Sequence, residues 1–328
     1  MSNKSLFVVW AGLAALMFWH LSLGGSQLDV VAALQLGWRD EGGVASTILY
    51  DIRLPRMWLA VSVGAVLGLS GAAMQSLLRN PLADPGLVGV SNFAALGAVI
   101  SLYFGWAAVA WWVLPLGGML GACLAVVAIF LLAGLQSNGL SLILAGVAVN
   151  ALAGSLIALA LNFSANPYAM SEIVYWLLGS FANRSSVDVA MALPFMAAGA
   201  VAIFFSRHFL DALSLGEDTA QSLGYSLLHY RGLVIIGVAL AVGAAVSVSG
   251  NIGFVGLVVP HLMRPLVKHR PSHLLTVSAL AGAAFMLLAD ILVQIFAVGQ
   301  ELKLGVVTAL VGGPFFLWLI WRLRRSYV

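Results

Sequence analysis

Residues 110–135 read A-W-W-V-L-P-L-G-G-M-L-G-A-C-L-A-V-V-A-I-F-L-L-A-G-L and carry no charged side chain. A helix needs about 20 mostly apolar residues to cross the ~30 Å hydrocarbon layer of a membrane. Because lipid satisfies no backbone polar group, a segment of this composition is expected to cross as a helix. The stretch therefore predicts an α-helical membrane protein.

The rest of the chain has a similar composition. Of its 328 residues, 62% are hydrophobic and 8% are charged, whereas soluble domains carry roughly a quarter charged residues. We predict an all-α polytopic membrane protein, a single domain over residues 1–328 with about ten transmembrane helices. The apolar runs lie near residues 5–23, 56–78, 87–104, 110–135, 141–163, 188–206, 231–249, 252–264, 273–297 and 304–321. The eighth run contains Gly253, Gly256 and Pro260, so we expect a short or broken helix inside the bundle.

The basic residues predict the orientation. With the N-terminus inside and ten crossings, ten Lys and Arg residues lie in inner loops and five in outer loops. Lysine and arginine favour the cytoplasmic side of membrane proteins, so both termini are expected to be cytoplasmic. The inner group is Lys4, Arg79, Arg207, Arg231, Arg264, Lys268, Arg270, Arg322, Arg324 and Arg325; the outer group is Arg39, Arg53, Arg56, Arg184 and Lys303.

Two pairs of glycines lie four residues apart within apolar runs, Gly64 with Gly68 and Gly117 with Gly121. Small residues at this spacing let membrane helices approach each other closely, so we interpret them as packing positions. The single cysteine, Cys123, also lies in an apolar run. A disulfide within the chain is excluded, and a structural role for the thiol is favoured.

The longest inner connection contains L-G-E-D-T-A-Q-S-L-G at residues 215–224. Glu217 and Asp218 suit the first turn of a short helix, where acids complement the helix dipole, and Gly224 suits its end. A modest apolar face would consist of Leu215, Ala220, Leu223, Leu227 and Leu228. Because its acids disfavour anionic lipid, we expect a cytoplasmic helix at about residues 213–226 that docks into a groove on a partner protein.

Two further stretches allow two interpretations each. Arg53 and Arg56 of R-L-P-R either snorkel at the membrane surface or form outward cations that dock an acidic patch on a soluble partner. The inner loop at residues 79–92 holds prolines and glycines that predict a rigid cytoplasmic elbow. Turn chemistry alone explains this loop, yet the loop also places Asn80 and Leu82 where a gate could lie.

Taken together, these motifs resemble the family of ABC importer permeases for iron–siderophore complexes, heme and cobalamin. The resemblance runs from Arg53 to about Trp321 and covers most of the chain. The motifs that carry it are, in order, R-L-P-R, R-N-P-L-A-D-P-G-L-V-G-V-S, Y-W-L-L-G-S, L-G-E-D-x-A-x-x-L-G, G-x-I-G-F-V-G-L-V-V-P-H and G-V-V-T-A-L-V-G-G-P-F-F.

The resemblance implies a type II importer, a homodimer of ten-helix subunits in the bacterial inner membrane. It implies two cytoplasmic ABC ATPase subunits, which bind ATP and Mg²⁺ and receive the short helix. The coupling residues would be Leu215, Gly216, Glu217, Asp218, Ala220, Leu223 and Gly224. It also implies a periplasmic binding protein that docks onto Arg53 and Arg56. Because Gln294 stands where the family often has a further arginine, we hypothesise that Lys303 supplies a compensating contact.

The resemblance also implies an inner gate. In the family this gate draws on the N-P-L loop, here Asn80 and Leu82, and on the turn before the fifth span, here Gly139 and Leu140. That turn often carries small polar residues, so the way this gate closes is left open. The fifth span offers sparse polar positions, which suit a path that binds a bulky chelate weakly. They are Asn150, Ser155 and Asn162.

The expected function is ATP-driven alternating access that moves an iron chelate, a siderophore complex or heme, from periplasm to cytoplasm. Cobalamin is the alternative cargo, and the sequence does not separate these chelates. The chain holds no G-x-x-x-x-G-K-[ST] phosphate loop, so we expect it not to hydrolyse ATP. It holds no cysteine or histidine cluster at metal-ligand spacing, so we expect no metal ligand. We expect no enzyme, no catalytic residue and no cofactor of its own. Its expected partners are a second copy, the ATPases, the binding protein and membrane lipid, with no nucleic acid.

Two rival functions rest on single features. Asp290 lies within an apolar run, and an intramembrane acid is a candidate proton carrier of a secondary transporter; it is equally a candidate structural hydrogen-bonding anchor. The sequence G-L-S-G around Ser70 matches the short motif of rhomboid proteases, with His261 as a possible base. The protease mechanism has no use for the number of spans or for the acidic helix of residues 213–226.

Overall fold

The structure of the chain, a computed structural model, describes residues 3–24, 29–38, 43–86, 89–134, 139–164, 167–296 and 302–326. Every regular element in these ranges is helical, so the predicted all-α class is confirmed. The helices that coincide with predicted apolar runs are α1 (Asn3–Ser22), α4 (Leu54–Leu77), α5 (Val90–Tyr103), α6 (Val113–Ala133), α7 (Gly139–Asn162), α9 (Ser186–Phe205), α12 (Leu227–Ser249), α13 (Val255–Met263), α14 (Pro271–Ile295) and α15 (Leu304–Ser326). The others are α2 (Val30–Trp38), α3 (Val44–Thr47), η1 (Ile48–Arg53), η2 (Trp106–Ala108), α8 (Pro167–Leu177), α10 (Arg207–Leu213), α11 (Glu217–Ser222) and η3 (Arg264–Val267).

Seven helical segments are long and apolar enough to cross a membrane. They are Val44–Leu77, Val113–Ala133, Gly139–Asn162, Ser186–Phe205, Leu227–Ser249, Pro271–Ile295 and Leu304–Arg322. Three shorter apolar helices, Val9–Ser22, Val90–Tyr103 and Val255–Val267, lie in other predicted runs. A multi-pass helical membrane protein is thus supported, whereas the number of ten crossings stays a prediction. The expected short helix in the eighth run is confirmed, since α13 has nine residues.

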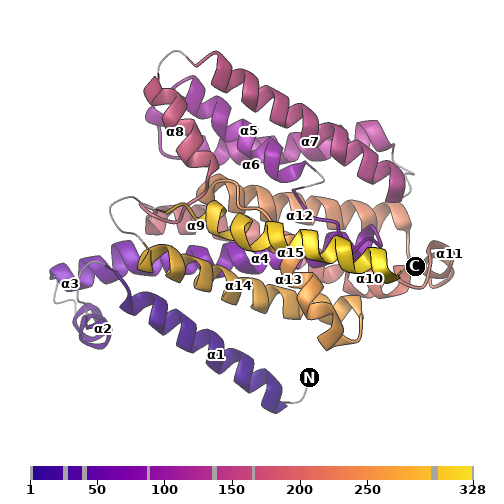
Figure 1. The fold of residues 1–328 in the computed structure, drawn as a ribbon, viewed down its shortest axis with the longest axis horizontal. Coiled ribbons are helices and arrows are strands. Elements are labelled where there is room, and N and C mark those ends of the chain that lie inside the picture. The colour runs from indigo at the N-terminus through magenta and orange to yellow at the C-terminus, as the bar shows by residue number, and fades with distance from the viewer. Residues whose placement is uncertain are drawn as a thin grey trace.

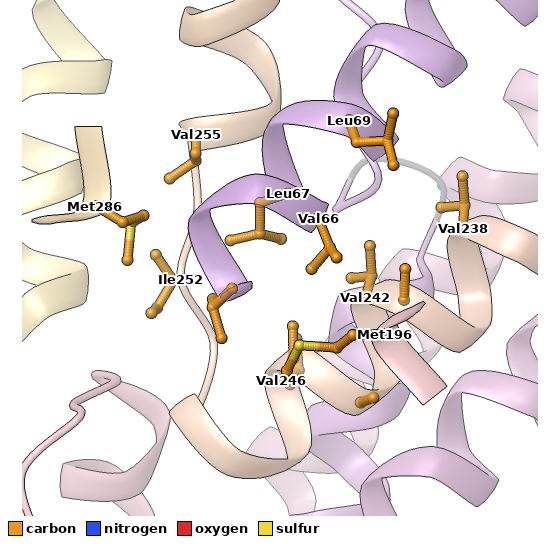
Figure 2. Packing of buried hydrophobic residues seen from close by; sticks show 14 of the residues in the cluster. Val66, Leu67, Leu69, Met196, Val238, Val242, Val246, Ile252, Val255 and Met286 are labelled. Carbon is orange, nitrogen blue, oxygen red and sulfur yellow. The ribbon is translucent and has the colours of Figure 1, made fainter. Parts of the chain in front are cut away.

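Helix α4 lies at the centre of the bundle, packed along α14, α12, α13 and α9. Most of its side chains are buried. Figure 2 shows this core, in which Val66 and Leu67 of α4 lie between Val246 of α12 and Met286 of α14. Apolar side chains on all faces of α4 are expected of a helix that neighbours enclose.

The predicted glycine pairs do lie at close helix contacts. A Cβ atom on Gly64 or Gly68 would overlap the backbone carbonyl of Gly282 or Ser278 on α14. A Cβ atom on Gly121 would overlap the carbonyl oxygen of Phe93 on α5. The absence of side chains therefore lets these backbones touch, as the spacing predicted.

The loop after α4 packs against the bundle. Ala83 and Pro85 are buried, and a Cβ atom on Gly256 of α13 would lie 2.7 Å from Asp84 Oδ1 and 3.0 Å from Pro85 Cδ. This packing agrees with the rigid turn that the sequence predicted, while the cytoplasmic side of the loop stays a prediction. The packing partner itself lies more than 170 residues away in the sequence and was not predicted.

Helix α1 lies on the outside of the bundle along α14 and diverges from it toward the N-terminus (Figure 1). Its C-terminal end is held by the protein. The Arg53 Nη1 donates a hydrogen bond of 2.7 Å to the carbonyl oxygen of Leu21, and Nε2 of His20 lies 2.7 Å from Oδ2 of Asp290.

Candidate transport site

A cavity of about 390 Å³ opens between six segments of the bundle. Its wall is formed by the loop after α4, by α5, α7, α13 and α15, and by the connection from α12 to α13. Its lining residues are Asp84, Gly86, Asn92, Asn150, Asn251, Gly253, Phe254, Leu257 and Phe316. Of the polar path residues predicted on α7, Asn150 is the one that lies in this wall.

Three amide side chains form a hydrogen-bonded chain along the cavity wall. Asn92 Nδ2 donates to Asn150 Oδ1 over 2.6 Å, and Asn251 Nδ2 donates to Asn92 Oδ1 over 3.0 Å. The chain joins α5, α7 and the turn before α13, so it ties together three elements that meet at the cavity. Asn92 ends the loop at residues 79–92 and Asn251 occupies the variable position of the G-x-I-G-F motif, but no local pattern indicated that they meet Asn150.

Asp84 places a carboxyl group in the same wall, outside the membrane-spanning helices. Its Oδ2 accepts a hydrogen bond of 3.1 Å from the backbone N–H of Gly86. Burial raises the pKa of the Asp84 carboxyl to about 6, although the hydrogen bond from Gly86 acts in the opposite direction. The carboxyl group therefore titrates close to neutral pH.

Replacement of Asp84 by asparagine is expected to stabilise the purified protein at pH 7.5 and to have little effect at pH 4. Because the pKa is raised on folding from 3.8 to about 6, ionisation of Asp84 costs stability as the pH rises through this interval, by at most about 3 kcal/mol. Asparagine keeps an acceptor for the Gly86 N–H and cannot ionise. Unfolding midpoints in detergent between pH 4 and 8 measure the difference, with exposed Asp218→Asn as the control. Parallel curves for wild type and Asp84→Asn would contradict this assignment.

The two predicted gate segments lie near each other. Asn80 Oδ1 accepts the backbone N–H of Leu82 over 2.9 Å, which fixes the turn after α4. A Cβ atom on Gly139 would lie 3.9 Å from the carbonyl oxygen of Leu78. Leu140 is exposed. The start of α7 thus borders the end of α4, while the role of these residues as a gate stays a prediction.

Ser155 and Asn162, the other predicted path residues, are exposed on α7 and lie outside the cavity wall. The Ser155 hydroxyl donates to the carbonyl oxygen of Ala151 over 2.9 Å. A serine bonded to its own helix needs no further partner inside a membrane. Their place along a transport path stays a prediction.

The predicted coupling segment contains α11, which is shorter than the predicted helix. The guanidinium of Arg231 on α12 forms an ion pair with Glu217. The expected apolar face is divided, because Ala220 is fully buried while Leu215 and Leu223 are 70% and 62% exposed. Leu215 and Leu223 are therefore exposed on a segment that is held to the bundle by the Glu217–Arg231 ion pair and by the buried Ala220.

The side chain of Arg53 is buried against the end of α1, whereas the docking interpretation expects it to point outward. Arg56 is partly exposed, and its guanidinium holds Asp290 through bonds of 2.8 Å from Nε and 2.9 Å from Nη2. Lys303 Nζ lies 5.7 Å from the ring centre of Tyr175. Docking of a binding protein at these three residues stays a prediction.

Asp290 is the centre of a buried polar cluster that joins α1, α4 and α14. Besides Arg56 and His20, Gln294 Nε2 donates to its Oδ2 over 3.1 Å. Donors thus approach both oxygens of the carboxylate, and the side chain is fully buried. A buried carboxylate with all of these partners is suited to a structural anchor more than to a proton carrier.

The protease interpretation finds no support in the described residues. Ser70 is fully buried in the middle of α4, and its Oγ has no hydrogen-bond partner there. The other half of the proposed pair, His261, packs edge-to-face against Phe315 with ring centres 5.7 Å apart. A serine without a base or access to water cannot act as a nucleophile.

Long apolar helices around a cavity with four polar side chains in its wall indicate a multi-pass membrane protein. The sequence profile of the FecCD transport family matches residues 12–322, and the chain belongs to this family. It is 38% identical over 315 residues to YvrB of Bacillus subtilis (strain 168), called an uncharacterized ABC transporter permease protein, covering 94% of this chain and 86% of that one. It is also 38% identical over 281 residues to the vitamin B12 import system permease protein BtuC of Salmonella paratyphi A, covering 84% of both chains.

A solved structure gives the same result for the fold. It is an inward-facing conformation assigned to a metal-chelate type ABC transporter, with a TM-score of 0.86, 30% identity, and coverage of 97% of this chain and 99% of that chain. The chain is therefore an ABC importer permease of the FecCD and BtuC kind.

Proposed function

We propose that two copies of this chain form the membrane path of an importer that carries an iron chelate from periplasm to cytoplasm. Two ABC ATPases supply the energy by pressing on the segment of residues 213–226. The observation that carries this proposal is the pair of exposed leucines, Leu215 and Leu223, on a segment anchored by the Arg231–Glu217 ion pair. Exposed apolar side chains on a fixed polar segment are suited to docking into a partner.

The exposed face of α7 supports a homodimer. Its exposed large apolar residues are Leu140, Leu144, Val147, Leu152, Leu156 and Leu159. The same helix lines the cavity through Asn150. A second copy packed against α7 would place two cavities beside a common path, and it would leave the start of α7, with Gly139 and Leu140, at one end of that path.

The polar groups in the cavity wall support a chelated cargo. They are one carboxyl group and three amides, with no His or Cys among them. Such groups hydrogen-bond to the organic shell of a chelate, whereas amides bind transition metals poorly. Cobalamin is the second candidate, because similarity to a vitamin B12 import permease extends over 84% of the chain.

The test is uptake by proteoliposomes that contain this permease and its ABC ATPase, supplied with the binding protein and either a ferric hydroxamate siderophore, heme or cyanocobalamin. We expect ATP-dependent uptake of an iron chelate and none without the ATPase. Uptake of cyanocobalamin alone would select the second candidate. Uptake without ATPase or nucleotide would contradict the whole proposal.

The double variant Leu215→Glu/Leu223→Glu is expected to lower ATP-driven uptake at least tenfold, because two charges would enter an apolar contact with the ATPase. The fold should be unaffected, since both side chains are exposed. Val109→Glu is the matched control, an 82% exposed apolar residue after α5. ATPase binding, measured by co-purification, should fall together with uptake. Unchanged ATPase binding in the double variant would show that this segment does not dock.

A further inference from the structure

An apolar groove runs between α1, α14 and the segment that follows α13. It encloses about 620 Å³, and every lining side chain is apolar or absent. The lining includes Leu13, Leu16, Leu266, Val267, Leu280 and Ala284. The groove is separate from the transport cavity, with which it shares no residue.

The groove exists because α1 is fixed to the bundle at one end. His20 and Leu21, which bind Asp290 and Arg53, both lie in its last turn. Toward the N-terminus α1 diverges from α14 (Figure 1). Gly12 offers no side chain to fill the space, and no atom lies within 4 Å of a Cβ atom placed on it. The groove between α1 and α14 is therefore open along the apolar faces of the two helices.

A lysine and a histidine lie next to the wall of this groove. Lys268 and His269 directly follow Val267 of the groove wall, and both are exposed. Their positive φ angles, 50° and 63°, belong to a tight turn closed by a hydrogen bond of 3.2 Å from the His269 N–H to the carbonyl oxygen of Arg264. Arg270 is paired with Asp211. Within the described ranges, no carboxylate lies in salt-bridge contact with Lys268 or His269.

We propose that the groove binds an acyl chain of an anionic glycerophospholipid, whose phosphate lies against Lys268 and His269. Water is unfavourable in an apolar groove at the depth of membrane helices, so hydrocarbon fills it. Basic residues next to such a groove attract an anionic headgroup. A zwitterionic lipid fits the groove equally but gains less from the two side chains. The site thus selects lipids by the charge of the headgroup. The bound acyl chain packs against the part of α1 that diverges from α14 (Figure 1).

Native mass spectrometry of the purified full chain tests the proposal, with phosphatidylglycerol and phosphatidylcholine of identical acyl chains added at equal concentration. For the first tightly bound lipid, we expect at least threefold preference for phosphatidylglycerol. Lys268→Glu should reduce the ratio to about one, with phosphatidylcholine binding unchanged. Arg79→Glu removes an exposed cation after α4, outside the groove, and should keep the wild-type ratio. Ala284→Trp should reduce retention of both lipids by filling the groove.

Two results would overturn the site. One is equal retention of the two lipids by the wild type. The other is the same loss of preference in Arg79→Glu as in Lys268→Glu, since the preference would then follow total charge. A protein that co-purifies in place of lipid and is displaced by Ala284→Trp would assign the groove to a protein partner instead.

Discussion

Leucine in place of Gly71 is expected to abolish the folded protein. Gly71 is buried in α4, and a Cβ atom there would overlap the carbonyl oxygen and the Cα atom of Gly256 on α13. Both contacts are with backbone, which cannot rotate away as a side chain can. The rest of α4 is enclosed by α9, α12 and α14, so the helix cannot move to relieve the overlap. Overpacking that shifts the backbone is strongly destabilising.

Alanine at Gly71 already adds the overlapping atom, and we expect it to lower the apparent melting temperature clearly. Gly232 on α12 is the matched control, because no atom lies within 4 Å of its Cβ position. Alanine there should be neutral or stabilising by about 0.5–1 kcal/mol, since glycine is unfavourable within helices. Fluorescence-detected size exclusion after heating measures both variants. A wild-type profile for Gly71→Leu would mean that α4 and α13 are not in contact.

Removal of the Asp290 carboxylate is expected to destabilise the protein by about 3–5 kcal/mol, the usual cost of leaving a buried ionic partner unpaired. In Asp290→Ala, the Arg56 guanidinium loses both of its bonds to the carboxylate, and His20 Nε2 loses its 2.7 Å contact with Oδ2. The end of α1 would then be held chiefly through Arg53. Thermal unfolding in detergent gives the free-energy difference.

Arg270→Ala is the control for this variant, because its pair with Asp211 is largely exposed and should contribute less than about 1 kcal/mol. Asp290→Asn should also destabilise, since an amide presents N–H groups to donors that require acceptors. An Asp290→Asn protein that is fully stable but inactive would instead support the proton-carrier interpretation.

Sequence reasoning predicted well what depends on composition and local spacing. Apolar runs gave the helices, because a segment such as 110–135 has no other way to satisfy its backbone in lipid. The glycine pairs predicted close contacts between helices, because the lack of a side chain permits such a contact at the glycine itself. The short α11 was predicted from acids and glycines within ten residues.

What depends on distant partners could not be predicted. Arg53 and Arg56 look alike in R-L-P-R, yet one is bound to the end of α1 and the other to Asp290, 234 positions away. Asn150 was predicted as a polar path residue. Its contact with Asn92, and the contact of Asn92 with Asn251, form only because α5, α7 and the turn before α13 meet in the fold. A pattern in one stretch of sequence contains no information on such meetings.

The Arg231–Glu217 ion pair has a mechanical consequence. It joins α11 to the first turns of α12, a helix of 23 residues that runs uninterrupted for about 34 Å. Directly beyond the far end of this helix stands Asn251, the last member of the amide chain. A displacement of Glu217 would therefore be passed along a single helix, and the end of that helix is separated from Asn251 in the cavity wall by one residue, Gly250.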